Sequence, residues 1–471
     1  VPSAPPSGPG GTAPVGTRTR AARTARIARV GGRAGADFAL HRARRVFASA
    51  ERQAELDRRF ELRTAEHVTA ALGNMKGALM KLGQMASYLD AGLPAPVREA
   101  LASLQQDAPP MAPELAAEVV ERELGRPPDR LFDTWDPLPL ASASIGQVHR
   151  AVTRDGRAVA VKVQYPGVDE AIRADLDNAG LLFQGMGVAF PGLDPGPLVD
   201  ELRTRVIEEL DYVGEARNQR HFVEFYRGHP FVHVPAVVDE LSTARVLTTE
   251  LAEGARFAEV ATWSQDERDL AAEAIYRFVF RSLYRLRAFN GDPHPGNYLF
   301  RPGGRVTFLD FGLVKYFEPG ELDVFGDMIR AMVDERDTAR FRRIIEAVGL
   351  LRPGTSFTDE QIRDYFGHFY EFVMDDAVVT ITHEWSAQTI SRFFDTTGPH
   401  GEMMKATNLP PAFVIIQRIN LGLFAILGDL RATANFRRIA DELWPWVDGP
   451  PSTPLGEEEA AWLAARSPSR T

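Results

Sequence analysis

The stretch "NGDPHPGNYLF", residues 290–300, holds an acid and an amide at a fixed interval just ahead of an apolar pair. Asp292 follows a glycine, and Asn297 comes five positions after Asp292. The stretch "VTFLDFG", residues 306–312, then supplies a second acid, Asp310. Both stretches contain short strand patterns, so Asn297 and Asp310 are expected at adjacent strand ends. An amide carbonyl and a carboxylate, together with phosphate oxygens, are ligands that suit Mg²⁺. Asp292 would then orient or deprotonate an attacking hydroxyl group or water.

A lysine in a second strand pattern is the expected partner of such a site. The residues "ASIGQVHRAV" (143–152), a turn at Asp155-Gly156 and "AVAVKVQY" (158–165) predict a β-hairpin. Lys162 is the single lysine among the β-branched residues of the second strand. A charge that points into an apolar sheet needs a partner or an anionic ligand. The alternative is a strand lysine whose ammonium group reaches solvent.

The helical segment "IEELDYVGEARNQ", residues 207–219, offers acids that could pair with Lys162. These acids are Glu208, Glu209, Asp211 and Glu215. They are too many to be explained by one ion pair, and a solvated acidic helix face is the alternative. A lysine strand, then an acid and an amide five residues apart, then Asp-Phe-Gly is the order found in protein kinases.

Two features depart from an ordinary protein kinase. The glycine-rich phosphate loop is missing, and four small residues stand in its place: Ala141, Ser142, Ala143 and Ser144. Alanine stiffens such a turn, and its methyl group limits the approach of the backbone to phosphates. The expected catalytic loop also lacks His-Arg-Asp.

Composition narrows the class of protein. The chain has 471 residues, of which 44% are apolar and 25% charged, as in an ordinary globular protein. A net charge of −10 argues against nucleic acid as the main partner. The absence of cysteine excludes disulfides, thiolate metal sites and thiol nucleophiles, and it fits a reducing compartment. We therefore expect a cytoplasmic protein. The nine arginines between Arg18 and Arg45 suit contact with an anionic membrane surface, and a solvated disordered arm is the alternative.

Outside these motifs the pattern is mainly helical. Residues 47–90 have no proline and predict an amphipathic helix or helix pair. "FVHVPAVV" (231–238) and "ARVLTTEL" (244–251) predict two further strands, and the chain beyond Ala255 is almost all helical. The most apolar stretch, "AFVIIQRINLGLFAILGDL" (412–430), carries Arg418 and Asn420 in its middle. Charged and polar groups are costly at that depth in a bilayer, so we expect a buried helix.

Six stretches together resemble the UbiB/AarF/ADCK (ABC-one) family of atypical kinases, in the branch of the coenzyme Q kinases. They are "KLGQ" (81–84), "LASASIGQVHRA" (140–151), "VAVKVQYPGV" (159–168), "EELDYVGEA" (208–216), "DPHPGN" (292–297) and "LDFG" (309–312). The resemblance spans roughly residues 65–330 and is highly specific.

The resemblance implies a role for each matching residue. Lys162 is the nucleotide-binding lysine, Glu215 its helix partner, Asp292 the catalytic acid, and Asn297 and Asp310 the metal ligands. Nucleotide contacts are expected at Ala141, Ser142, Ala143, Ser144, Lys162, Glu250 and Ala252. Lys81, Gly83 and Gln84 form the KxGQ motif, and Glu209 and Asp211 form the ExD motif. In the family the KxGQ extension folds over the active site, so we expect Lys81 and Glu209 to latch it shut.

The resemblance also implies an α+β, bilobal protein-kinase-like fold with an N-terminal helical KxGQ extension. The expected parts are a disordered basic tail (1–46), the KxGQ extension (47–110), an N-lobe with inserted helices and the ExD motif (111–254), a helical C-lobe (255–450) and a flexible C-terminal tail (451–471). The implied function is that of an ATP-binding, Mg²⁺-dependent atypical kinase or ATPase with ATP or ADP as its nucleotide.

The implied partners are lipid or quinone precursors, enzymes of isoprenoid-quinone biosynthesis, and the membrane surface as a peripheral contact. Two alternatives stay open. "GDPHPGN" (291–297) is also similar to the catalytic loop of aminoglycoside and choline kinases, which indicates a small-molecule phosphotransferase. A catalytically silent pseudokinase scaffold that only binds nucleotide is the other.

Overall fold

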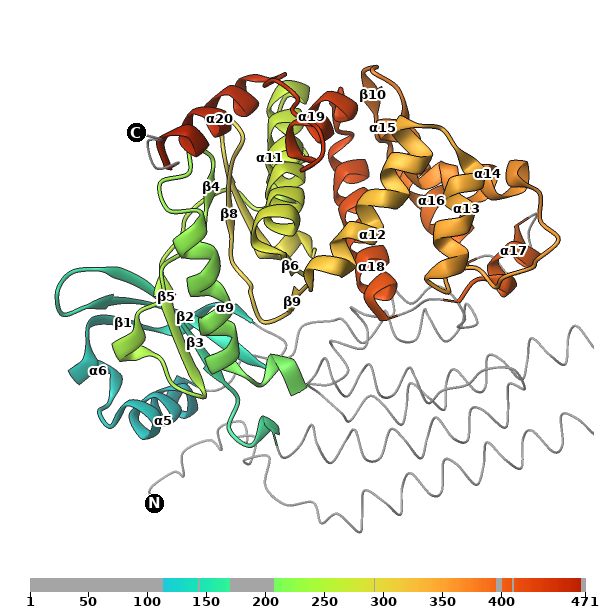
Figure 1. The fold of residues 1–471 in the computed structure, drawn as a ribbon. Helices are drawn as coiled ribbons and strands as arrows, with labels where there is room; N and C mark the ends of the chain where they lie inside the picture. Colours follow the sequence, from blue (N-terminus) through green and yellow to red (C-terminus); the bar gives the residue numbers. More distant parts are fainter. Residues whose placement is uncertain are drawn as a thin grey trace, which may run out of the picture.

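The computed structural model describes residues 113–142, 145–169, 207–291, 293–394, 400–408 and 411–466. The predicted basic tail and the predicted KxGQ extension, including Lys81, Gly83 and Gln84, lie outside these residues. The described chain forms a strand-rich part followed by a larger helical part, as Figure 1 shows.

A four-stranded antiparallel sheet forms the centre of the first part (Figure 1). Its strands, in spatial order, are β1 (Phe132–Ser142), β2 (Gly146–Thr153), β3 (Ala158–Gln164) and β5 (Val246–Glu250). The predicted hairpin is confirmed, because β2 pairs with β3 from Gly146 opposite Gln164 to Val152 opposite Ala158. Gly156 closes its turn with a φ of 87°, a left-handed conformation that glycine adopts without steric cost.

Three helices accompany this sheet. They are α5 (Pro113–Leu124), α6 (Pro128–Leu131) and α9 (Tyr212–Phe225). Helix α5 buries Ala116, Val119 and Val120 in one apolar cluster with Val159, Val161 and Val163 of β3. Since alternate residues of a strand face the same side, the valines of β3 cover one face of the sheet.

The helical part contains the main apolar core. Its helices are α10 (Phe257–Val260), α11 (Gln265–Arg281), α12 (Pro319–Ile329), α13 (Thr338–Ala347), α14 (Asp359–Gly367), α15 (Glu371–Met374), α16 (His383–Phe394), α17 (Gly401–Ala406), α18 (Pro411–Leu430), α19 (Phe436–Leu443) and α20 (Pro454–Arg466). Helices α11 and α18 supply much of this core, with Ile275, Phe278, Phe424 and Leu427 among the buried residues. The predicted buried helix at 412–430 is therefore confirmed as α18.

Short elements connect these helices. A three-stranded sheet consists of β4 (Val232–His233), β8 (Arg305–Phe308) and β7 (Tyr298–Arg301), and two-stranded sheets pair β6 (Ala288–Asn290) with β9 (Val314–Tyr316) and β10 (Val379–Thr380) with β11 (Thr433–Ala434). The 3₁₀ turns are η2 (Asp239–Leu241), η4 (Pro295–Asn297) and η6 (His368–Tyr370), and the π-helical turns are η3 (Ser282–Leu286) and η5 (Arg330–Asp334). None of the helices in the described residues is long and apolar enough to cross a membrane.

Two expectations need correction. Only Val232 and His233 of the predicted strand 231–238 form a strand, and they pair with β8 in the helical part. Val237, beyond Pro235, makes a single antiparallel bridge with Thr249 of β5 in the four-stranded sheet. Pro235 has no amide hydrogen for a sheet ladder, so the strand cannot continue through it. The expectation of a flexible tail is wrong for residues 454–466, which form α20 and bury Leu455 and Glu459.

Candidate active site

Lys162 of β3 and Glu215 of α9 form an ion pair that joins the sheet to the helix. The Lys162 Nζ donates to both carboxylate oxygens of Glu215 at 2.9 Å. The Lys162 side chain is 20% exposed and that of Glu215 only 4%. Lys162 is therefore not a strand lysine that extends to solvent, and Glu215 is not part of a solvated acidic face. Bidentate, charge-assisted geometry of this kind fixes the position of both groups.

Electrostatics hold Lys162 in its charged form. Burial alone would lower the pKa of Lys162, but the carboxylates of Glu215 and Asp310 outweigh that effect and raise it well above its ordinary value. Burial raises the pKa of Glu215 to about 7, against the opposing attraction of Lys162. The ring of buried Tyr212 lies under the ammonium group, 5.0 Å from Nζ to the ring centroid, and adds a cation–π contact.

The N-terminus of α9 places Glu215 in the first helical turn. Asp211 is the N-cap residue, and its Oδ1 accepts a hydrogen bond from the Gly214 N–H at 2.8 Å. A Cβ at Gly214 would lie 2.4 Å from Asp211 Oδ2, so any other residue there would displace the capping carboxylate. The structure thus gives Asp211, which the sequence assigned to the ExD motif, a capping contact next to the ion pair.

Replacing Asp211 with alanine is expected to destabilise the fold by about 1 kcal/mol, since an N-cap side chain typically contributes that much. The loss should be local, because the uncapped turn is the one that carries Glu215. Chemical denaturation gives the change in the free energy of unfolding. Asp211→Asn keeps an acceptor oxygen and serves as the control, and equal losses in both variants would contradict a capping role.

Asp310 lies on the other side of Lys162. Its Oδ2 is 3.8 Å from the Lys162 Nζ, and its Oδ1 accepts from the Gly312 N–H at 2.9 Å. The Asp310 side chain is 34% exposed, so its carboxylate is accessible to a ligand. The Asn290 Nδ2 donates to the Asp310 carbonyl and helps to fix this turn.

The next residue, Phe311, ties this turn to α9. Its ring is fully buried and lies 4.8 Å from that of Phe222 on the helix. The Asn218 Nδ2 donates to the Phe311 carbonyl at 3.1 Å. No motif marks Asn218 in the sequence, although its spacing of three residues from Glu215 places both on one helix face.

The β7–β8 hairpin places Asn297 beside the turn that carries Asp310. Tyr298 pairs with Phe308, and the Leu309 N–H donates to the Asn297 carbonyl at 3.0 Å. Asn297 therefore lies opposite the residue that precedes Asp310, as expected for adjacent strand ends. The Asn297 N–H donates to the His294 carbonyl at 2.9 Å, which closes the turn of η4.

The remaining predicted site residues are only partly described. Asp292, Ala143 and Ser144 lie outside the described residues. Ala141 and Ser142 end β1 and pair with Val148 and Gln147 of β2. Glu209 directly precedes the capped turn of α9, and its predicted partner Lys81 is outside the described residues, so the latch stays a prediction.

The expected adenine-binding segment follows β5. Glu250 ends that strand, and its side chain contacts the His233 Nε2 at 3.3 Å. The hydrogen bond with His233 lowers the pKa of Glu250 below its ordinary value. Ala252 comes two positions later, in the connection that leads to α10.

The donor set suits a magnesium ion that a nucleotide brings with it. The described residues contain no group of three or more His, Cys, Asp and Glu side chains that could hold a metal ion alone. Asp310 and Asn297 would supply one carboxylate and one amide oxygen. Mg²⁺ commonly binds through one or two carboxylates plus phosphate oxygens and waters, so these two residues fit a nucleotide-bound ion.

Comparison with known proteins places this site in a family. Residues 103–344, about half of the chain, match the ABC1 atypical kinase-like domain. The mitochondrial atypical kinase COQ8B of Rattus norvegicus is 36% identical over 277 residues, which cover 58% of this chain and 52% of that protein. The mitochondrial atypical kinase coq-8 of Caenorhabditis elegans is 34% identical over 276 residues, 57% of this chain and 37% of that protein.

The chain spans about half the length, or less, of these curated relatives. Among solved structures, the complex of Rv3197 with erythromycin from Mycobacterium tuberculosis has a TM-score of 0.61 and 34% sequence identity. The match covers 84% of this chain and 99% of that one. These comparisons confirm the kinase-like class of the fold. The order of the motifs, a matching domain and a matching structure agree, and the chain belongs to the ABC1 atypical kinase-like family.

Proposed function

We propose that the chain binds ATP with Mg²⁺ at the site formed by Lys162, Glu215, Asp310 and Asn297, and that it transfers or hydrolyses the γ-phosphoryl group. The observation that carries this proposal is the Lys162–Glu215 ion pair with Asp310 3.8 Å from the same ammonium group. A buried lysine held between two carboxylates presents a fixed positive charge to an anion beside a metal-binding carboxylate.

Each residue then has a distinct task. Lys162 contacts the phosphates, and Glu215 holds its ammonium group in place. Asp310 and Asn297 hold the magnesium ion, which neutralises the negative charge that develops on the phosphate oxygens. Asp292 orients the attacking hydroxyl group or water, and the backbone at Glu250 and Ala252 contacts the adenine. The residues 141–144 and the KxGQ extension shape access to the site.

The family points to the class of acceptor. Because the relatives include the COQ8 atypical kinases, we assign the chain to isoprenoid-quinone or related lipid metabolism. The acceptor is then water or a lipid precursor, and the chain works in the cytoplasm at the inner face of the membrane. We further propose that the KxGQ extension, which lies outside the described residues, excludes protein substrates.

A small-molecule phosphotransferase is the second candidate. One observation favours it, namely that the structurally similar protein from Mycobacterium tuberculosis is known in a complex with erythromycin, which bears hydroxyl groups. The two candidates share the nucleotide site and differ in the acceptor. A pseudokinase scaffold would share nucleotide binding only.

Removal of magnesium should separate nucleotide binding from a structural role of the site. We expect ATP to bind with an affinity that falls about tenfold or more when EDTA replaces Mg²⁺, a loss of about 1.4 kcal/mol or more. Without the ion, the Asp310 carboxylate and the ATP phosphates carry like charges with no cation between them. Calorimetric titration of the full chain measures this change, and equal affinities with and without Mg²⁺ would argue against a metal-assisted site.

Assays of turnover then identify the acceptor class. ATP consumption is measured alone, with anionic liposomes, with phenolic quinone precursors and with erythromycin, and the products are identified by mass spectrometry. Stimulation by liposomes or phenols supports the first candidate, and a phosphorylated macrolide supports the second. Binding of Mg²⁺–ATP without turnover under all four conditions would support the pseudokinase scaffold.

A further inference from the structure

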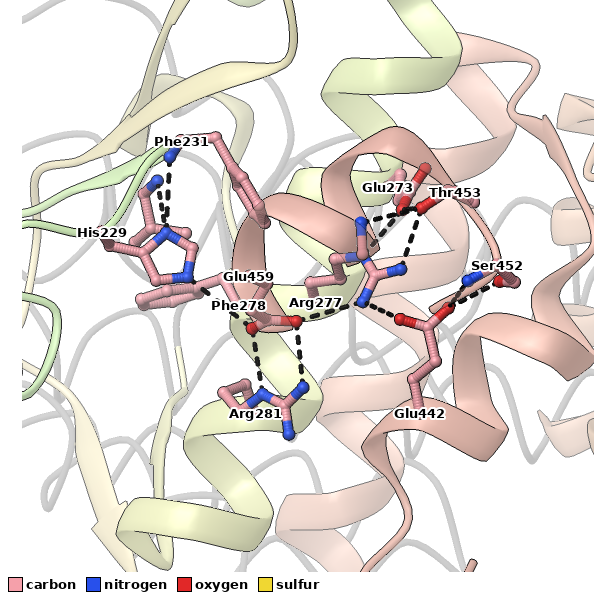
Figure 2. A network of polar contacts seen from close by, with 12 residues as sticks. His229, Phe231, Glu273, Arg277, Phe278, Arg281, Glu442, Ser452, Thr453 and Glu459 are labelled. Atoms are coloured by element: carbon pink, nitrogen blue, oxygen red, sulfur yellow. Dashed lines mark hydrogen bonds and ion pairs between the residues drawn. The ribbon is translucent and has the colours of Figure 1, made fainter. Parts of the chain in front are cut away.

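The C-terminal helix α20 is anchored on the helical part by buried charges (Figure 2). Glu459 of α20 is 1% exposed and accepts hydrogen bonds from Arg281 at 2.9 and 3.0 Å and from Arg277 at 3.1 Å. Both arginines belong to α11. The Thr453 hydroxyl caps the start of α20, accepting from the Gly456 N–H at 3.0 Å, and itself accepts from Arg277 at 3.0 Å. This end of α20 is therefore fixed to α11.

The far end of α20 contacts the C-terminal end of α9, the helix that carries Glu215. The Trp462 Nε1–H donates to the Arg227 carbonyl at 3.2 Å, and the Arg466 Nη1–H donates to the same carbonyl at 3.1 Å. The Arg466 guanidinium also lies 5.0 Å from the centroid of the Trp462 ring. Arg466 also donates to the Glu224 carbonyl in the last turn of α9 at 3.5 Å, where the final carbonyls have no partner within the helix and a cation is favourable at the negative end of the helix dipole.

The Trp462 ring packs beside the turn that follows α9. Its centroid is 4.4 Å from that of His229, and its ring also meets those of Tyr226 and Phe225. His229 is buried, and its Nδ1 accepts from the Val232 N–H at 3.0 Å, so its other nitrogen points toward Glu459 of the anchor. His229 thus contacts both Trp462, which meets α9, and Glu459 of the anchor, and Figure 2 shows the side with Glu459.

Helix α9 transmits this constraint to the ion pair. It is a continuous helix of 14 residues, with Glu215 in its first turn and the α20 contacts just beyond its last. Between them, Asn218 holds the Phe311 carbonyl and Gln219 donates to the Pro235 carbonyl at 2.7 Å. A helix of this length moves largely as one body, so a displacement at its C-terminus changes the position of Glu215 relative to Lys162.

We propose that Trp462 and Arg466 of α20 are positioning residues that hold the C-terminal end of α9 on the helical part and thereby keep Glu215 on Lys162. The proposal concerns the position of α9, and its effect on nucleotide use rests on the function proposed above. Release of α20 would loosen α9, so the C-terminal helix sets the active geometry of the site from outside it.

The test compares substitutions that leave the anchor intact. Trp462 is half-buried and Arg466 is exposed, so Trp462→Ala/Arg466→Ala removes the contact with α9 and retains Glu459. Arg466→Ala alone is a milder variant at an exposed position that keeps the fold. Glu458→Ala, on the exposed side of the same helix, is the matched control. Trp462→Phe/Arg466→Lys retains a ring and a cation and is the conservative rescue.

Hydrogen exchange and steady-state kinetics of the full chain are the two readouts. We expect amide exchange in residues 212–225 to accelerate about tenfold in the double variant, with a smaller increase in Arg466→Ala and parental exchange in α11. The kcat/KM of the double variant for ATP should fall about fivefold or more, mainly because its KM rises. The rescue variant should restore both values, and Glu458→Ala should change neither.

The outcomes separate this inference from the proposed function. The positioning role is overturned if the parent binds Mg²⁺–ATP and amide exchange in residues 212–225 stays parental in both Trp462→Ala/Arg466→Ala and Arg466→Ala. If the parent binds no nucleotide but α9 exchange still accelerates in the double variant, the contact holds α9 and the proposed function fails. A rescue variant that behaves like the double alanine variant would also overturn the positioning role.

Discussion

Asp310→Asn is expected to lower ATP turnover by about 100-fold or more, the scale at which single electrostatic groups contribute in active sites. The amide is neutral, so it neither binds Mg²⁺ as a carboxylate does nor attracts Lys162 from 3.8 Å. Its remaining oxygen can still accept from the Gly312 N–H, so the turn and the fold should survive. Single-turnover and steady-state ATP hydrolysis measure the loss, and thermal unfolding checks the fold.

The control for this prediction is Asp323→Asn, which makes the same chemical change at an exposed position of α12. It should leave turnover at the parental level. Turnover of Asp310→Asn within about twofold of the parent, with an unchanged unfolding temperature, would contradict the assignment of Asp310 as a metal ligand. It would also remove the main support for a magnesium-dependent kinase or ATPase.

Arg277→Leu is expected to destabilise the protein by about 3–5 kcal/mol, because it removes one partner of a buried charge network. The Arg277 side chain is fully buried and contacts three carboxylates: Glu273 at 2.7 Å, Glu442 at 2.8 Å and Glu459 at 3.1 Å. Without it Glu459 keeps its ion pair with Arg281, whereas Glu273 and Glu442 keep only the neutral hydrogen bonds from Thr453 and from Ser452. Chemical denaturation of the full chain gives the free energy of unfolding.

The pH dependence of the loss in stability of Arg277→Leu distinguishes the loss of the buried charge network from a simple loss of packing. Burial raises the pKa of Glu273 above its ordinary value, and Arg277 opposes that rise, so the variant should raise it further. A carboxyl group whose pKa is raised by folding binds a proton more tightly in the folded state than in the unfolded state. The loss in the free energy of unfolding of Arg277→Leu is therefore complete at high pH, and it shrinks as the pH falls through the pKa of Glu273 in the folded state. We expect a smaller deficit at roughly pH 5 than at pH 8. Glu459 behaves differently, since its interactions with His229, Arg281 and Arg277 outweigh its burial and lower its pKa to about 2.

Arg150→Leu provides the matched control for Arg277→Leu. Arg150 also pairs with a carboxylate, that of Glu253, but the two side chains are 50% and 70% exposed. Its loss should change stability little, because solvent screens exposed ion pairs. A deficit in Arg277→Leu that is independent of pH, or no larger than that of Arg150→Leu, would contradict a buried charge network.

The site illustrates what local patterns can predict. Lys162 stands out because a charged residue interrupts a run of β-branched residues, and Asn297 and Asp310 stand out because two strand ends bring them together. The hairpin of β2 and β3 follows from alternation and a turn at Gly156. The choice of Glu215 among four neighbouring acids needed the resemblance to a family, since the helix pattern alone allowed a solvated face.

The C-terminal helix illustrates what local patterns could not predict. Residues 451–471 are polar and rich in alanine and glutamate, and they read as a flexible tail. Glu459 becomes a buried residue only because Arg277 and Arg281, on a helix about 180 positions earlier, lie against it. A pairing over such a distance leaves no periodic signal in either segment. The strand at 231–238 was overestimated because Pro235 interrupts it, and the sequence pattern does not show that its two halves pair with different strands, β8 and β5.

The sequence by itself determined the class of the fold, the order of the motifs and the residue types of the site, since these depend on short-range spacing and on the chemistry of single side chains. Only the tertiary structure decided that both carboxylate oxygens of Glu215 accept from Lys162, that Asp211 caps the helix that carries Glu215, and that α20 contacts the far end of that helix. The physical reason is that burial and electrostatic pairing depend on which segments meet in space, and distant segments meet only when the whole core forms.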